Sequence, residues 1–178
     1  MKQIIFLHLF IIFSSSCSCL KTNVYNSDSV VLTASNLTLL DGKYERFSKQ
    51  QGTNAGDLYW AFFDRGYNHR GNTEFFELKV INKNKLKVLY IDEYETIKDK
   101  IMKGEIKNGY FEFKRKYLFI PAVYVNLYRD SKFRIRLTKD NNLLADYNQI
   151  SFGTFVVIVP FYENEKANNM IFKRIENE

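Results

Sequence analysis

Cysteine, histidine, proline and glycine are all scarce in this chain, and each scarcity removes a class of protein. The two cysteines, Cys17 and Cys19, both lie near the N-terminus, so no disulfide framework can hold the rest of the chain together. His69 is the one histidine after them, which excludes a Cys/His catalytic pair and a His-rich zinc site. With only 2 Pro and 8 Gly beside 16 Phe and 12 Tyr, the composition favours strands and a packed core over disorder.

Long apolar runs and nucleotide-binding motifs are also missing. The run Ile4–Phe13, broken only by His8, is too short to cross a bilayer, which takes about 20 residues. Neither a Gly-x-Ser-x-Gly motif nor a Gly-rich phosphate loop is present, and no paired carboxylates stand out as catalytic. The sequence therefore predicts no enzyme, no metal and no cofactor.

What is present at the N-terminus is an export signal. Lys2, the apolar run Ile4–Phe13 and three serines precede the first cysteine, which is the order of a secretory signal peptide. A cysteine at the cleavage point can carry lipid, so we predict a signal peptide over residues 1–16 and lipidation at Cys17, with Cys19 as the alternative. Residues 17–38 are expected to be the lipidated N-terminus and a flexible tether, because they are polar and rich in Ser, Asn and Thr. The predicted location is the periplasmic face or the cell surface of a bacterial membrane, with membrane lipid as partner.

In residues 39–176, short segments of alternating polarity are separated by turn residues, which is typical of an all-β domain. Phe133, Ile135 and Leu137 alternate with charged residues, as in a half-buried strand. Asn108-Gly109 is a strong hairpin signal. We expect an antiparallel up-and-down barrel of roughly eight to ten strands, since closure removes open edges, with a β-sandwich as the alternative. Three local expectations are that Leu58–Phe63 is an aromatic strand, that the strand Phe152–Val159 stops at Pro160, and that Asn164–Asn169 holds a helical turn.

Several segments of the sequence resemble those of a known protein family. They are Leu40-x-Gly42-x-Tyr44, the segment Leu58–Phe63 with the single Trp60, the hairpin Lys103–Gly109 and the closing segment Phe172–Ile175. Together with the signal ending in Ser-Ser-Cys, they resemble the lipocalin-like (calycin) small lipoproteins of Bacteroidetes-type bacteria. The resemblance covers Leu39–Ile175 and implies a barrel.

Aromatic side chains suggest where a barrel of this kind would hold a ligand. Rings that face the interior can line an apolar pocket; the alternative is that they fill the core, as side chains do in small barrels. The pocket candidates are Tyr44, Trp60, Phe62, Phe111, Phe113 and Tyr124.

Basic residues suggest a second surface. The formal net charge is +6, and in an exported protein the acidic partner would be a lipid headgroup, an acidic glycan or an acidic protein, with no nucleic acid. A solvated basic face that aids solubility is the alternative. The residues expected to project together are Lys114, Lys116, Lys132, Arg134 and Arg136.

Two functions of different classes follow. The first is a lipid-anchored exported binding module, with a small apolar ligand in its barrel. The second is an interaction protein of the immunity type that inhibits a periplasmic enzyme or toxin through its loops and basic face.

Overall fold

The computed structural model describes residues 28–48, 56–63, 74–92, 95–114, 116–120, 125–155 and 159–176. Cys17, Cys19, Tyr124 and the expected signal peptide lie outside these ranges, so what was predicted for them stays a prediction. Within the ranges, none of the helices has the length and apolarity needed to cross a membrane.

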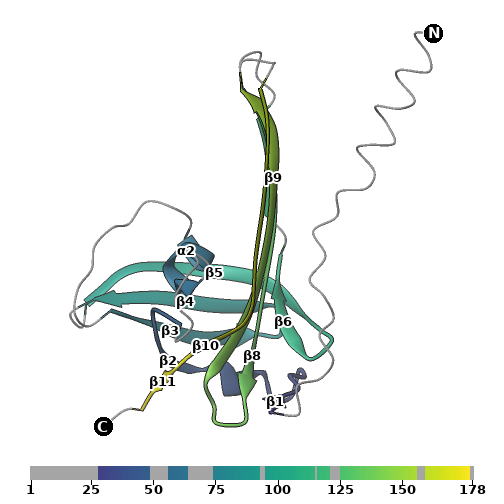
Figure 1. The fold of residues 1–178 in the computed structure, drawn as a ribbon. Helices are drawn as coiled ribbons and strands as arrows, with labels where there is room; N and C mark the ends of the chain where they lie inside the picture. The colour runs from purple at the N-terminus through teal and green to yellow at the C-terminus, as the bar shows by residue number, and fades with distance from the viewer. Residues whose placement is uncertain are drawn as a thin grey trace.

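In the described ranges, eleven strands form one antiparallel sheet, in which most neighbours along the chain are also neighbours in space (Figure 1). The strands are β1 (Ser29–Val30), β2 (Gly42–Glu45), β3 (Phe75–Asn82), β4 (Lys85–Asp92), β5 (Glu95–Lys107), β6 (Tyr110–Phe113), β7 (Lys116–Ile120), β8 (Val125–Thr138), β9 (Leu143–Phe155), β10 (Val159–Phe172) and β11 (Arg174–Ile175). Their order is β10-β9-β8-β6-β5-β4-β3-β2-β11, with β1 and β7 also paired to β8. The expected all-β, up-and-down architecture is confirmed.

The ladder remains open instead of closing into a barrel. Its two edge strands, β10 and β11, stand at opposite ends of the order, yet only Lys173 separates them in the chain. The Lys173 carbonyl accepts a hydrogen bond from the Glu45 amide at 2.9 Å. The sheet is therefore bent far enough for its two ends to meet at this one link.

Short turns set the register, as the sequence predicted. Lys107 pairs with Tyr110, which leaves Asn108 and Gly109 as a two-residue turn with φ values of 51° and 77°. Positive φ at both central residues is the type I′ geometry that suits the twist of a hairpin. The β3–β4 turn at Lys83 and the β8–β9 turn at Asn141 likewise lie where polar clusters interrupt the alternating pattern.

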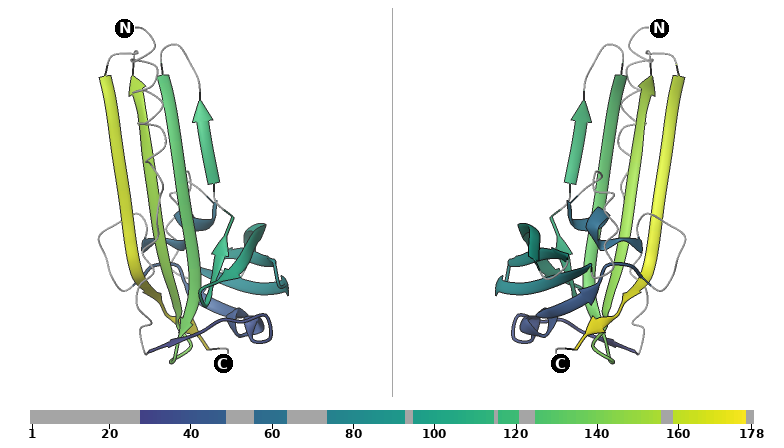
Figure 2. Two further views of the ribbon diagram at one scale, coloured as in Figure 1. Left: turned by 90° about the vertical axis from the view of Figure 1, so that its right-hand side faces the viewer. Right: turned by 90° about the vertical axis from the view of Figure 1, so that its left-hand side faces the viewer.

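Strand β8 organises the second half of the molecule. β7, β6 and β1 lie in line along one of its sides, and β9 pairs along the other. Figure 2 shows that β7, β8, β9 and β10 continue well beyond the body formed by β2–β6, as a four-stranded projection. We call this projection the arm.

Leu58–Phe63 is a helix, α2, so the prediction of an aromatic strand is wrong. Asp57 stands before the first turn, and its Oδ1 accepts a hydrogen bond from the Tyr59 amide at 2.8 Å, which is an N-cap interaction. Lys100 donates to the Phe62 carbonyl at the other end, at 3.1 Å. An apolar run without periodicity does not distinguish a buried strand from a short buried helix.

Helix α2 fills the interior of the bent sheet. Phe62 contacts Phe76 of β3, Phe113 of β6 and Phe133 of β8, with ring centroids 5.3–5.7 Å apart. Trp60 meets Tyr147 of β9 edge-on at 4.6 Å. Because these rings come from opposite parts of the sheet, α2 ties its two halves into one core.

Three further expectations are corrected. Pro160 lies inside β10, where it is tolerated because β10 is an edge strand that, in the part of the chain the structure describes, pairs only with β9. Residues 164–169 belong to the same strand and form no helical turn. The tether ends earlier than position 38: β1 pairs with β8, Leu32 is buried, and the 3₁₀ helix η1 (Leu37–Leu40) follows.

Candidate functional site

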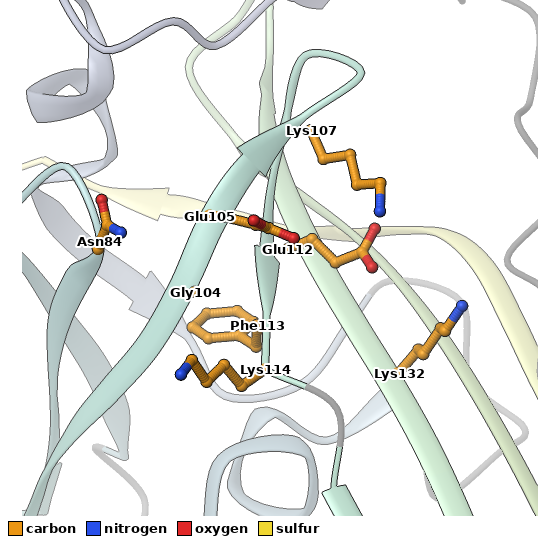
Figure 3. Close-up of a pocket in the computed structure, with 8 residues that line it drawn as sticks. All are labelled: Asn84, Gly104, Glu105, Lys107, Glu112, Phe113, Lys114 and Lys132. Carbon is orange, nitrogen blue, oxygen red and sulfur yellow. The ribbon is translucent and has the colours of Figure 1, made fainter.

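An open groove lies where β5 passes from the β4 side of the sheet to the β6 side. Its volume is about 530 Å³, within the range of ligand pockets. The lining residues are Asn84, Gly104, Glu105, Lys107, Glu112, Phe113, Lys114 and Lys132 (Figure 3). Five of these eight are charged, so the groove is a polar site.

The β5–β6 hairpin places the charges. Its two-residue turn sets Glu105 directly opposite Glu112, and Glu112 pairs in turn with Arg134 of β8. Figure 3 shows the Glu112 carboxylate extending toward the side where Lys107 and Lys132 point. Like charges that face each other across a ladder repel. Cations near Glu105 and Glu112 therefore reduce the electrostatic repulsion between the two carboxylates.

A buried layer of charge adjoins the groove on the same face of the sheet. Arg134 donates to Oδ2 of Asp146 from Nε at 2.9 Å and forms an ion pair with it through Nη2 at 2.8 Å. The Arg134 and Arg136 guanidinium carbons lie 4.0 Å and 4.3 Å from the centre of the Tyr110 ring. Cations packed on an aromatic face are held by cation–π attraction, which is strongest where water is excluded.

Arg136 is the unusual member of this layer. It is 2% exposed, and its Nε and Nη2 have no hydrogen-bond partner among the described residues. A buried donor without a partner is costly, and the Tyr110 ring offsets only part of that cost. Burial raises the pKa of Tyr110, and the charge of Asp146 raises it further, while Arg136 and Arg134 lower it.

Among the members whose side chains are described, the predicted basic row does not form one exposed surface. Arg134 and Arg136 are buried, because Asp146 faces Arg134 across the β8–β9 ladder and Tyr110 covers both guanidinium groups. Lys114 points away from Lys132 across the groove (Figure 3). Lys116 lies opposite Ser131 in the β7–β8 register, one position out of step with Lys132.

The five aromatic pocket candidates that the structure describes pack in the core. Tyr44, Phe62 and Phe111 are fully buried, and Phe113 nearly so. Trp60 packs against the same cluster. Tyr44 donates to the Leu40 carbonyl at 3.0 Å, which fixes its hydroxyl in place. These contacts favour the core-filling alternative, although Phe113 also borders the groove.

Three of the groove residues, Phe113, Lys114 and Lys132, were among the residues predicted from the sequence, but for other surfaces. The prediction missed Glu105 and Glu112, although a signal for this pair existed. Once Asn108-Gly109 is assigned a two-residue turn, Glu105 and Glu112 must pair. No local feature of the sequence indicated that Arg134 forms an ion pair with Asp146. Among the described residues, no group of three or more His, Cys, Asp or Glu side chains is placed to hold a metal ion.

No protein-family model, curated protein or solved structure matches this chain. Neither these comparisons nor the chemistry of the described groove gives a positive indication of catalysis.

Proposed function

We propose that this protein is a non-catalytic, lipid-anchored, exported binding module, and that the groove between β5, β6 and β8 is its ligand site. The observation that carries the binding role is an open volume of about 530 Å³ lined by carboxylates and ammonium groups together. The export signal and the lipid anchor rest on Lys2, Ile4–Phe13 and the Ser-Cys step in the sequence.

The groove is a better candidate than the interior of the sheet. An apolar ligand inside would have to displace α2, whose Phe62 ring alone contacts rings from three strands. Opening that cluster would cost several kcal/mol, as large-to-small changes in cores do. The small apolar ligand expected from the sequence is therefore replaced in this proposal by a polar one.

The chemistry of the lining indicates the ligand class. Lys107 and Lys132 offer cations beside the carboxylates of Glu105 and Glu112, a combination that suits a ligand with both hydrogen-bonding and ionic groups. The charges adjoin a layer whose guanidinium groups are fixed against Tyr110. Because these guanidinium groups are already held in place, less side-chain freedom is lost when a ligand binds, which favours specific over diffuse electrostatic binding.

An array of charged oligosaccharides and charged peptides tests the proposal. We expect the full chain to bind a subset of the array, and Lys132→Glu or Glu112→Lys to remove or change that subset. Lys87→Glu is the matched control, since Lys87 is a half-exposed β4 residue paired with Asp99 and lies outside the groove lining. Binding that all three variants alter equally, or no binding by the wild type, would contradict the proposal. Selective binding of peptides would favour the interaction-protein alternative.

A further inference from the structure

The end of the arm carries a continuous row of aromatic residues. The register places Phe119 beside Tyr128, Tyr128 beside Phe152, and Phe152 beside Tyr162. Successive paired positions point to the same face of a sheet, so the four rings cross four strands side by side. Tyr128 and Phe152 are stacked at 4.6 Å, whereas Phe119 and Tyr162 at the two ends are 68% and 66% exposed.

The opposite face of the arm is apolar at the same level. Ile120, Leu127, Gly153 and Phe161 are paired across the four strands. Ile120 and Phe161 are exposed, and the Phe161 ring lies over Gly153, where a Cβ would be 2.8 Å from it. At this level of the arm, apolar side chains thus lie on both faces of the sheet.

Charge is excluded from this region over a defined length. No Asp, Glu, Lys or Arg occurs from Tyr117 to Tyr128 or from Ile150 to Tyr162. The nearest charged residues in the register are Arg129, Asp130 and Glu163. We call the part of the arm beyond these charged positions the arm tip, and its residues with described side chains are 119–120, 126–128, 152–154 and 159–162.

We propose that the arm tip inserts into the interfacial layer of a lipid bilayer. A partner protein that docks on one face would leave the apolar residues of the other face in water, whereas a bilayer receives both faces at once. Aromatic rings are the side chains that membrane–water interfaces favour, and the formal charge of +6 adds attraction to anionic headgroups. This contact is separate from the lipid on cysteine and does not depend on it.

The strand edges limit the depth of insertion. Within the described residues, β10 pairs only with β9 and β7 only with β8, so both outer edges present backbone groups that hydrocarbon cannot satisfy. Water and headgroups can satisfy them in the interface, which is entered to about 5–10 Å. Because a strand rises about 3.3 Å per residue, two or three residues of each strand span that depth. The aromatic row therefore lies close to the boundary between the acyl chains and the headgroups.

A fluorescence experiment reads insertion at the tip itself. Trp60 is the only tryptophan, so Trp60→Phe gives a background in which one new indole reports its own surroundings. The probe is Phe119→Trp, and the control is Ile101→Trp on β5, where the native side chain is similarly exposed at 55%. The full chain, with Cys17→Ala and Cys19→Ala, is mixed with vesicles of phosphatidylcholine and phosphatidylglycerol that carry brominated acyl chains.

We expect the indole of Phe119→Trp to shift to the blue and to be quenched by the brominated lipid, while that of Ile101→Trp changes little. Equal quenching of both indoles, or none at position 119, would overturn the proposal; the second result would direct the search to a protein partner. Co-sedimentation in the native Trp60 background provides an independent measurement. Phe119→Ser with Tyr162→Ser should weaken vesicle binding by about tenfold or more, whereas Ile97→Ser with Ile101→Ser should leave it unchanged. Equal weakening by the two pairs would also contradict insertion.

Discussion

Replacing Arg46 by Leu tests how the interior helix is held in the sheet. The Arg46 guanidinium is 5% exposed and binds both oxygens of Asp57, from Nε at 2.9 Å and from Nη2 at 2.7 Å. Its Nη1 also forms an ion pair with Glu74, whose side chain is 3% exposed. Because Asp57 caps α2, this one cation connects the helix to β2 and to the start of β3.

The substitution leaves two carboxylates without their cation in a water-poor site. Breaking a buried ion pair by removing one partner costs about 3–5 kcal/mol, and the guanidinium also loses its place against the rings of Tyr59 and Tyr90. A domain of this size has a total stability of about 5–15 kcal/mol. Arg46→Leu should therefore remove about a fifth or more of the free energy of unfolding.

Urea denaturation followed by fluorescence measures the loss, since Trp60 lies in α2 itself. The matched control is Lys79→Leu on β3, whose ion pair with Glu77 is exposed and worth about 0–1 kcal/mol. A loss below about 1 kcal/mol for Arg46→Leu would refute the reasoning, because it would mean that the network is as weak as a surface pair. Replacing both Arg46 and Glu74 by apolar residues, with Asp57 kept as the cap of α2, should recover part of the stability, as in other buried networks.

Two further predictions concern alkaline pH and one turn. Burial raises the pKa of Tyr44 from 10.0 to about 12. The charge of Arg174 lowers this pKa and that of Asp41 raises it, both by less than burial does. Burial is also the main cause of the raised pKa values of Tyr90 and Tyr110. The folded state then holds these protons more tightly than the unfolded state, so the contribution of these tyrosines to stability should be constant below pH 10 and fall as the pH rises toward 12, as thermal melts can show. Retained stability at pH 12 would contradict this. Gly109→Ala should destabilise the fold by about 1 kcal/mol or more, because φ is +77° at Gly109 and the new Cβ would be 3.0 Å from Val31. Urea denaturation measures this loss. An unchanged urea midpoint would contradict the prediction, because it would show that the β5–β6 turn relaxes without cost.

The hairpins were predictable because their signals are local. Asn108 and Gly109 adopt the positive φ values that few other residues tolerate, and strand alternation on either side then fixes which residues pair. The same logic placed Phe133, Ile135 and Leu137 correctly in the core. These features depend on neighbours in the chain, and a sequence shows such neighbours directly.

The helix and the buried charges depend on partners that are distant in the chain. Leu58–Phe63 is helical because Asp57 caps it and rings from four or more strands surround it, none of which its own six residues reveal. Arg134 and Arg136 look like solvent-facing residues of an alternating strand until Asp146 and Tyr110 are placed beside them. The alternation assigned the correct face, and the expectation that a charged face is an exposed one was the error.

Labelling with a lipid precursor tests the central claim, that this is a lipid-anchored exported protein, most directly. Cells that produce the full chain are supplied with a fatty-acid analogue, and the protein is isolated and examined for the label. We predict a labelled wild type, an unlabelled Cys17→Ala/Cys19→Ala double variant, and single variants that identify Cys17 as the modified residue. An unlabelled wild type, or label that persists in the double variant, would contradict the account.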